Sequence, residues 1–137
     1  MKTALNPDHP CPAYHCGRLL ALFDNVQRTA LGDVGAGVVQ RFYGGALTNP
    51  AGVFARLSQL SMVHLDKIGG GLEHQLGAEL AETHNRIAGY PGALTQDEQA
   101  LFALGFWHQT AELNRRKAAA IEAKKQRLTE TTYKDQS

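Results

Sequence analysis

Apolar residues recur every three or four positions along most of this chain, a spacing typical of helices that bury one face. The clearest case follows Asn49, which can cap a helix, and Pro50, which suits the first helical position because its missing N–H costs nothing there. The seam of this predicted helix, over residues 50–68, comprises Val53, Phe54, Leu57, Leu60, Ser61, His64, Leu65 and Ile68. At about 100° per residue, Arg56 and Lys67 fall on a stripe beside the seam.

The same spacing predicts four further helices, over residues 12–31, 35–43, 72–88 and 96 to at least 126. Gly32 should end the first of these helices, and Asp33 can cap the next. The Gly44-Gly45 pair should then stop the second helix, because glycine weakens a helix interior.

Turn and capping residues set the remaining boundaries. The three glycines at 69–71 should break the helical course, although the family resemblance described below leaves a bent continuation open. The sequence Gly-Tyr-Pro-Gly at 89–92 is a clear loop signal. Thr95 and Glu98 form a capping box, which predicts the start of the last helix.

Helices with short connections predict an all-α fold, a compact bundle of about five helices. Residues 13–127 should form the bundle, the proline-rich residues 1–12 a leader or loop, and residues 128–137 a frayed tail. Apolar side chains surround much of the first half of the last helix, so we expect that half to be central. The aromatic side chains of Phe102, Phe106, Trp107 and Tyr90 could stack on bases, but their helical spacing predicts that they lie in the core.

Charge is distributed unevenly. The formal net charge of the 137 residues is +1, with a balance of −3 over residues 1–114 and +4 over residues 115–137. A near-neutral total argues against a whole-surface grip on nucleic acid and leaves room for a local patch. No apolar run approaches the ~20 residues of a membrane span, and the N-terminus lacks the apolar core of a secretory signal. We therefore expect a cytoplasmic protein with no membrane partner.

Cations gather in two groups on the predicted helices. Arg41, Arg56 and Lys67 lie beside apolar seams, whereas the last helix has a group that falls within about 100° of one another, formed by Arg116, Lys117, Lys124 and Arg127. Binding to a nucleic-acid backbone needs cations spaced along a surface and little base chemistry. The alternative is a solvated helix face, in which Glu112 pairs with Arg116 and Glu122 pairs with Lys125 on the same helix.

The leader brings together four potential zinc ligands, His9, Cys11, His15 and Cys16. Their spacing matches no familiar zinc module, so we predict no metal site and interpret Cys16 as a small packed residue. Neither cysteine has the glycine-rich elbow of a nucleophile. His64 and His108, on apolar faces, should be hydrogen-bonded core residues. The sequence predicts no enzyme activity and no cofactor.

Three blocks of the sequence resemble a known family. They are residues 40–68, residues 13–27 (AYHCGRLLALFDNVQ) and residues 98–109 (EQALFALGFWHQ). Together they resemble the C-terminal region of the large subunit of type I-C CRISPR interference complexes. That region is also made separately as the small subunit of the complex. Met1 fits an internal translation start, so the resemblance implies the separate small subunit.

The resemblance implies a non-catalytic subunit of a crRNA-guided surveillance complex in antiviral defence. It would stabilise the crRNA–target DNA heteroduplex and the displaced non-target strand through sequence-independent contacts. The expected strand contacts are Arg41, Arg56, Lys67, Arg116, Lys117 and Lys124, with Arg18 and Arg28 as second choices. Expected protein partners are the backbone subunits, the large subunit and further copies of the chain itself. The large subunit recognises the motif beside the target through its N-terminal part, which this sequence lacks, so we do not assign that role.

Two alternatives stay open at this point. One is a helical adaptor that bridges proteins without touching nucleic acid. In that case the salt dependence of binding would contain no contribution from contacts with nucleic acid. The other is a small metal- or thiol-dependent protein centred on the leader, which elemental analysis of the purified protein would identify.

Overall fold

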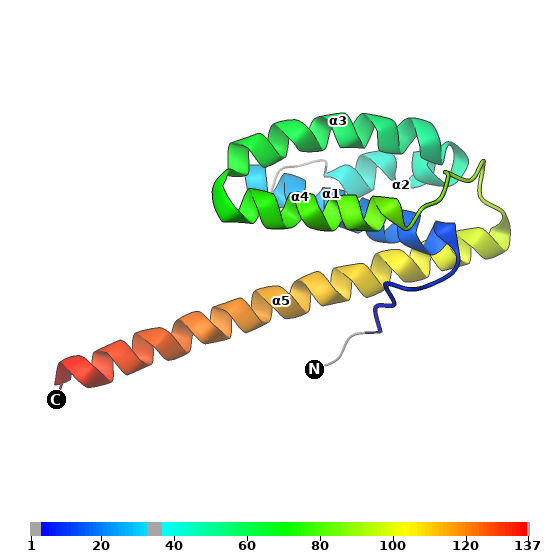
Figure 1. The fold of residues 1–137 in the computed structure, drawn as a ribbon. Coiled ribbons are helices and arrows are strands. Elements are labelled where there is room, and N and C mark those ends of the chain that lie inside the picture. Colours follow the sequence, from blue (N-terminus) through cyan, green and yellow to red (C-terminus); the bar gives the residue numbers. More distant parts are fainter. Residues whose placement is uncertain (1–3, 33–36, 137) are drawn as a thin grey trace.

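The computed structural model describes residues 4–32 and 37–136, with side chains up to Tyr133. Within these residues the regular structure is entirely helical, and the predicted all-α fold is confirmed (Figure 1). The helices are α1 (Pro12–Leu31), α2 (Val38–Thr48), α3 (Pro50–Ile68), α4 (Gly70–Asn85) and α5 (Gln96–Gln136). None of these helices is both long enough and apolar enough to cross a membrane.

α1 is the central helix, because it contacts each of the other four (Figure 1). Every residue from Ala13 to Phe23 is buried, an unbroken run that a helix packed on one side does not show. The prediction that the first half of α5 is central is therefore wrong. α5 packs along one side of α1 and leaves Leu104 and Trp107 44% and 65% exposed.

Two glycines bring the backbones of α1 and α5 into direct contact. A Cβ atom added to Gly17 would lie 2.0 Å from the carbonyl oxygen of Phe102. A Cβ added to Gly105 would lie 2.0 Å from the carbonyl oxygen of Tyr14. Only glycine fits at both positions, and the close approach lets each helix cover the other over a long stretch.

Local capping chemistry sets the starts of α3 and α5 as predicted. The Oδ1 atom of Asn49 accepts a hydrogen bond from the Gly52 N–H at 3.3 Å, and Pro50 occupies the first position of α3. Before α5, the Thr95 N–H donates to Glu98 Oε1 at 2.9 Å and the Glu98 N–H donates to Thr95 Oγ1 at 3.2 Å. This reciprocal pair is the capping box.

α2 differs from its predicted course because it runs through Gly44-Gly45 and ends at Thr48. Ala46, just beyond the glycines, is fully buried, and the Leu47 carbonyl accepts a hydrogen bond from the Leu94 N–H at 2.8 Å. These tertiary contacts outweigh the weak helix propensity of glycine. The predicted start at residue 35 and the predicted Asp33 cap lie outside the described residues.

The chain reverses direction between α3 and α4, which lie side by side (Figure 1). Gly69 and Gly70 have φ angles of 67° and 66°, the left-handed region that favours glycine. The glycine run therefore breaks the helix, and the bent continuation does not occur. α4 ends at Asn85, and the loop predicted at residues 89–92 precedes α5.

α5 contains 41 residues, and its second half projects beyond the bundle (Figure 1). Every side chain from Lys117 to Tyr133 is exposed. At the other end of the chain, the leader is attached to the bundle. The Asn6 N–H donates to the Tyr14 hydroxyl at 3.0 Å, and Asp8 forms an ion pair of 2.7 Å with Arg86.

Candidate nucleic-acid interface

Three of the predicted cations form an exposed flank on α2 and α3, which we call the α2–α3 flank: Arg41, Arg56 and Lys67. The helical pattern that buries Val38 on α2 and Phe54 and Leu57 on α3 turns these cations outward. The guanidinium carbon of Arg56 lies 5.7 Å from the centre of the Phe42 ring. This cation–π contact joins the two helices and holds the arginine against the surface.

The spacing on α3 suits an extended polyanion. Arg56 and Lys67 are eleven residues apart, so they lie about 16 Å apart along the axis and within about 20° of the same face. Within the described residues none of Arg41, Arg56 and Lys67 forms an ion pair. Their charges are therefore available to an external partner.

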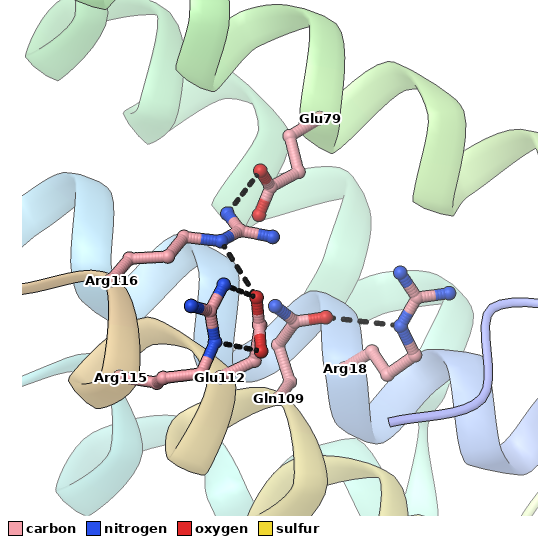
Figure 2. A network of polar contacts seen from close by, with 6 residues as sticks. All are labelled: Arg18, Glu79, Gln109, Glu112, Arg115 and Arg116. Carbon is pink, nitrogen blue, oxygen red and sulfur yellow. Dashed lines mark hydrogen bonds and ion pairs between the residues drawn. The ribbon is translucent and has the colours of Figure 1, made fainter. Parts of the chain in front are cut away.

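Arg116 lies in a different environment, inside a network between α4 and α5 (Figure 2). Its Nη1 atom lies 2.6 Å from Glu79 Oε2 and its Nε atom lies 3.2 Å from Glu112 Oε1. Arg115 donates two further bonds to Glu112, at 3.0 and 2.7 Å. Burial opposes the charge of Arg116, but the hydrogen bonds and charges of Glu79 and Glu112 outweigh it and raise the pKa of Arg116. This arginine binds α4 to α5.

Arg18 is buried in the contact between α1 and α5 and is only 6% exposed. Its Nε atom donates to Gln109 Oε1 at 3.0 Å (Figure 2), and its Nη1 atom lies 3.0 Å from His15 Nδ1. Because arginine only donates, His15 Nδ1 accepts, and His15 Nε2–H donates to the His9 carbonyl at 2.6 Å. Burial lowers the pKa of both Arg18 and His15. As placed here, Arg18 has no access to a nucleic-acid strand.

Arg28 and Lys117 both line a groove between α1, α2 and α5. Arg28 is held by Asp24, whose Oδ2 atom accepts from Arg28 Nε at 2.8 Å. Lys117 approaches the same groove from α5 and is exposed. Lys124 lies farther along α5, on the projecting half, together with the exposed Lys125 and Arg127.

The groove also contains Trp107, for which the sequence-based prediction is wrong. Helical spacing predicted Trp107 in the core, but its side chain is 65% exposed and lines the groove. The predicted core position of Phe102 is confirmed, because it is fully buried. Phe106 is partly buried, with its ring 5.7 Å from that of Tyr43. Trp107 follows Phe106 directly and so points about 100° away from it.

The histidines and cysteines of the leader mainly stabilise the start of α1. The His9 ring stacks on Tyr14 at 4.3 Å and its Nδ1 atom accepts from the Cys11 N–H at 3.0 Å. Burial raises the pKa of Cys16 to about 12, so its thiol stays protonated at neutral pH. In residues 4–32 and 37–136, no group of three or more His, Cys, Asp or Glu side chains is placed to hold a metal ion.

His108 and His64 were both predicted to be hydrogen-bonded core residues. His108 Nδ1 lies 2.7 Å from the Tyr14 hydroxyl, which confirms a hydrogen bond between α5 and α1. His108 is partly buried at this contact. His64 is also partly buried, on α3, without a side-chain hydrogen bond among the described residues.

Comparison with known proteins identifies a family. None of the curated proteins matches this sequence. The family model described as CRISPR-associated protein (Cas_Csd1) matches residues 1–114. The match covers the bundle and the α1–α5 contact, and it ends before the basic second half of α5. Because it spans most of the chain, this protein belongs to the Cas_Csd1 family of CRISPR-associated proteins.

Proposed function

We propose that this chain is the non-catalytic small subunit of a type I-C CRISPR surveillance complex. In this role it holds the crRNA–target DNA heteroduplex and the displaced non-target strand through contacts that do not depend on sequence. Family membership supports a place in CRISPR defence. The observation that carries the finer proposal is the α2–α3 flank, where Arg41, Arg56 and Lys67 are exposed without an ion-pair partner among the described residues.

Spaced cations on a helical surface contact phosphates and release counterions, whatever the base sequence. In a guide-RNA complex base pairing reads the sequence, so a subunit needs only positive surface and shape. The exposed cations of the α2–α3 flank meet that requirement, as do Lys117 and Lys124 on α5. Arg18 and Arg116 do not, because Arg18 is buried and the guanidinium group of Arg116 is already paired with Glu79 and Glu112.

The proposal includes the absence of a reaction. A nucleophilic cysteine needs a lowered pKa, whereas burial raises that of Cys16 to about 12. His15 donates to a backbone carbonyl and accepts from Arg18, so neither of its ring nitrogens is left for proton transfer. The histidine and cysteine side chains at the start of α1 therefore serve packing in this proposal.

The decisive experiment reverses two charges of the α2–α3 flank in the assembled complex. The Arg56→Glu/Lys67→Glu variant should shorten the lifetime of the opened DNA loop. It should also lower the slope of target affinity against salt concentration by about two, one for each lost phosphate contact. Arg56→Lys/Lys67→Arg, which preserves the charge, is the matched control and should behave like the parent. Unchanged loop lifetime in the reversed variant at physiological salt would refute the role of this flank.

A protein–protein adaptor is the second candidate, and exposed apolar side chains on α3 favour it. Met62 and Val63 are 71% and 67% exposed, close to the α2–α3 flank along the same helix. Backbone subunits, the large subunit or further copies of the chain would dock there. If the chain is only an adaptor, charge reversal changes subunit incorporation and leaves the salt dependence of DNA binding unaltered.

A further inference from the structure

The groove between α1, α2 and α5 has a volume of about 400 Å³ and combines three chemistries. An aromatic ring, hydrogen-bond acceptors and cations line it, supplied by Asp24, Asn25, Arg28, Gln40, Trp107 and Lys117. Small-ligand sites in proteins have volumes of roughly 300–1,000 Å³, so the groove is large enough for a small organic group.

Trp107 provides the aromatic surface. Its ring packs against the ring of Phe106, with centroids 5.9 Å apart and planes at 76°, and the side chain stays 65% exposed. A tryptophan held at one edge and open to solvent suits stacking with a flat partner. Every nucleobase has such a face, which makes stacking tolerant of sequence.

Two residues that line the groove each have a buried oxygen atom that lacks a hydrogen-bond donor among the described residues. Asn25 is only 8% exposed, and its Oδ1 atom has no hydrogen-bond partner within the described residues. The Oδ1 atom of Asp24 is in the same condition, while its Oδ2 atom accepts from Arg28. A buried acceptor without a partner is unfavourable, so a ligand that brings a donor is favoured here. Adenine, cytosine and guanine carry exocyclic amino groups that donate.

The charges of the groove suit an anion near its rim. Arg28 and Lys117 contribute two positive charges and Asp24 one negative charge. Lys117 and Arg28 also line a second, adjoining pocket at the end of α1 with Thr29 and Gly32. A phosphate attached to a stacked base would reach cations on both α1 and α5.

We propose that this groove binds one unpaired nucleotide of a single strand. The base stacks on Trp107, an amino group donates to Asn25, and the phosphate contacts Lys117 and Arg28. The inference rests on the proposed function, because the displaced DNA strand is the source of unpaired nucleotides in the complex. It adds a base-binding site to a subunit otherwise proposed to contact the backbone alone.

Trp107 is the only tryptophan in the sequence, so its fluorescence reports on the groove directly. Oligo(dA) added to the full-length chain should quench the Trp107 emission. An abasic oligonucleotide of equal length and charge should bind about tenfold more weakly, within the range that one base–aromatic stack provides. Equal quenching by both, or no quenching at saturating oligo(dA), would overturn the proposal.

Two variants with labelled oligo(dA) separate the parts of the site. Trp107→Leu should remove the preference for oligo(dA) over the abasic strand and preserve the helical circular dichroism, because the side chain is mostly exposed. Lys117→Gln should weaken both strands and lower the salt slope by about one. Gln75→Ala, at an exposed position on α4 that does not line the groove, is the control and should leave the affinity for both strands unchanged. Because thymine has no exocyclic amino group, equal affinities for oligo(dT) and oligo(dA) would refute the proposed contact between the base and Asn25.

The same measurement in the assembled complex uses 2-aminopurine in the displaced strand. Its emission should be quenched by the parent chain and recover with Trp107→Leu. Loop lifetime that is insensitive to Arg56→Glu/Lys67→Glu would refute the proposed function and leave the groove result standing. If the 2-aminopurine emission is the same with the parent chain and with Trp107→Leu, the proposed nucleotide site in the groove is refuted. The result for the α2–α3 flank is then unaffected.

Discussion

Gly17 of α1 lies directly against the carbonyl oxygen of Phe102 on α5, where a Cβ atom would approach to 2.0 Å. Three residues farther along α5, Gly105 faces the carbonyl oxygen of Tyr14 in the same way. The neighbouring atoms are backbone atoms of regular helices and have little freedom to move aside. The close crossing of α1 and α5 therefore depends on the absence of two side chains.

We expect Gly17→Ala and Gly105→Ala to lower the free energy of unfolding by about 3 kcal/mol or more, because overpacking against backbone forces the helices apart. Gly44→Ala is the matched control, since an added Cβ on this α2 residue meets nothing within 4 Å. It should stabilise the chain by about 0.5–1 kcal/mol. Urea unfolding monitored by circular dichroism provides the comparison. Tolerance of alanine at position 17 would contradict the close crossing.

Arg18 and Arg41 should respond in opposite ways to the same substitution. Arg18→Met leaves the buried Gln109 Oε1 and His15 Nδ1 without their donor, so we expect a loss of stability of about 2 kcal/mol. Arg41→Met changes an exposed side chain and should shift stability by less than about 0.5 kcal/mol. In the assembled complex, Arg41→Met should lower the salt slope of target binding by about one. If a folded Arg18→Met variant also lowers the salt slope of target binding, Arg18 contacts nucleic acid after all.

Stability should fall as the solution becomes more acidic than the ordinary histidine pKa of 6.5. Burial lowers the pKa of His15 in the folded chain, so the unfolded chain binds more protons below pH 6.5. The stabilisation is complete above that pH and is lost on the way down. Its slope is at most about 1.4 kcal/mol per pH unit for one group.

His15→Asn should be less stable at pH 7 and show a shallower loss of stability between pH 6.5 and 5. His74→Gln, at an exposed position on α4, is the control and should retain the slope of the parent. Denaturant unfolding at each pH gives the free energies. Parallel curves for the parent and His15→Asn would show that His15 does not carry the effect.

Removing the residues after Lys117 should leave the bundle intact, because every described side chain from Ala118 to Tyr133 is exposed. We expect the free energy of unfolding to change by less than about 0.5 kcal/mol, while the helical signal falls. In the complex, loss of Lys124 and its neighbours should reduce the salt dependence of strand retention. A marked fall in stability of the shortened chain would indicate contacts that the described structure does not contain.

The sequence predicted well those features that depend on a few neighbouring residues. Asn49 with Pro50, and Thr95 with Glu98, set helix starts through bonds within three residues, so their chemistry is visible in the sequence. The course of α2 through Gly44-Gly45 was not predictable in this way. It depends on the burial of Ala46 and on a bond from Leu94, which lies far along the chain.

The candidate site shows the same division. Helical periodicity alone places Arg41, Arg56 and Lys67 outside the core, and the structure has them exposed. Arg18, in contrast, bonds a glutamine 91 residues away, and Arg116 bonds a glutamate 37 residues away. No local spacing reveals such partners. The exposure of Trp107 likewise follows from α5 being covered on one side only.

The direction of the projecting half of α5 is determined by the angle at which α5 crosses α1. The tip at residue 136 lies 31 residues, or about 46 Å, beyond Gly105, so a tilt of about 10° at the crossing would move the tip by about 8 Å. That displacement is larger than the rise of one helical turn. The position of Lys124 and its neighbours therefore depends on Gly17 and Gly105, which lie far from them along the helix. A methyl group added at either glycine would shift the tip of α5 without contacting it.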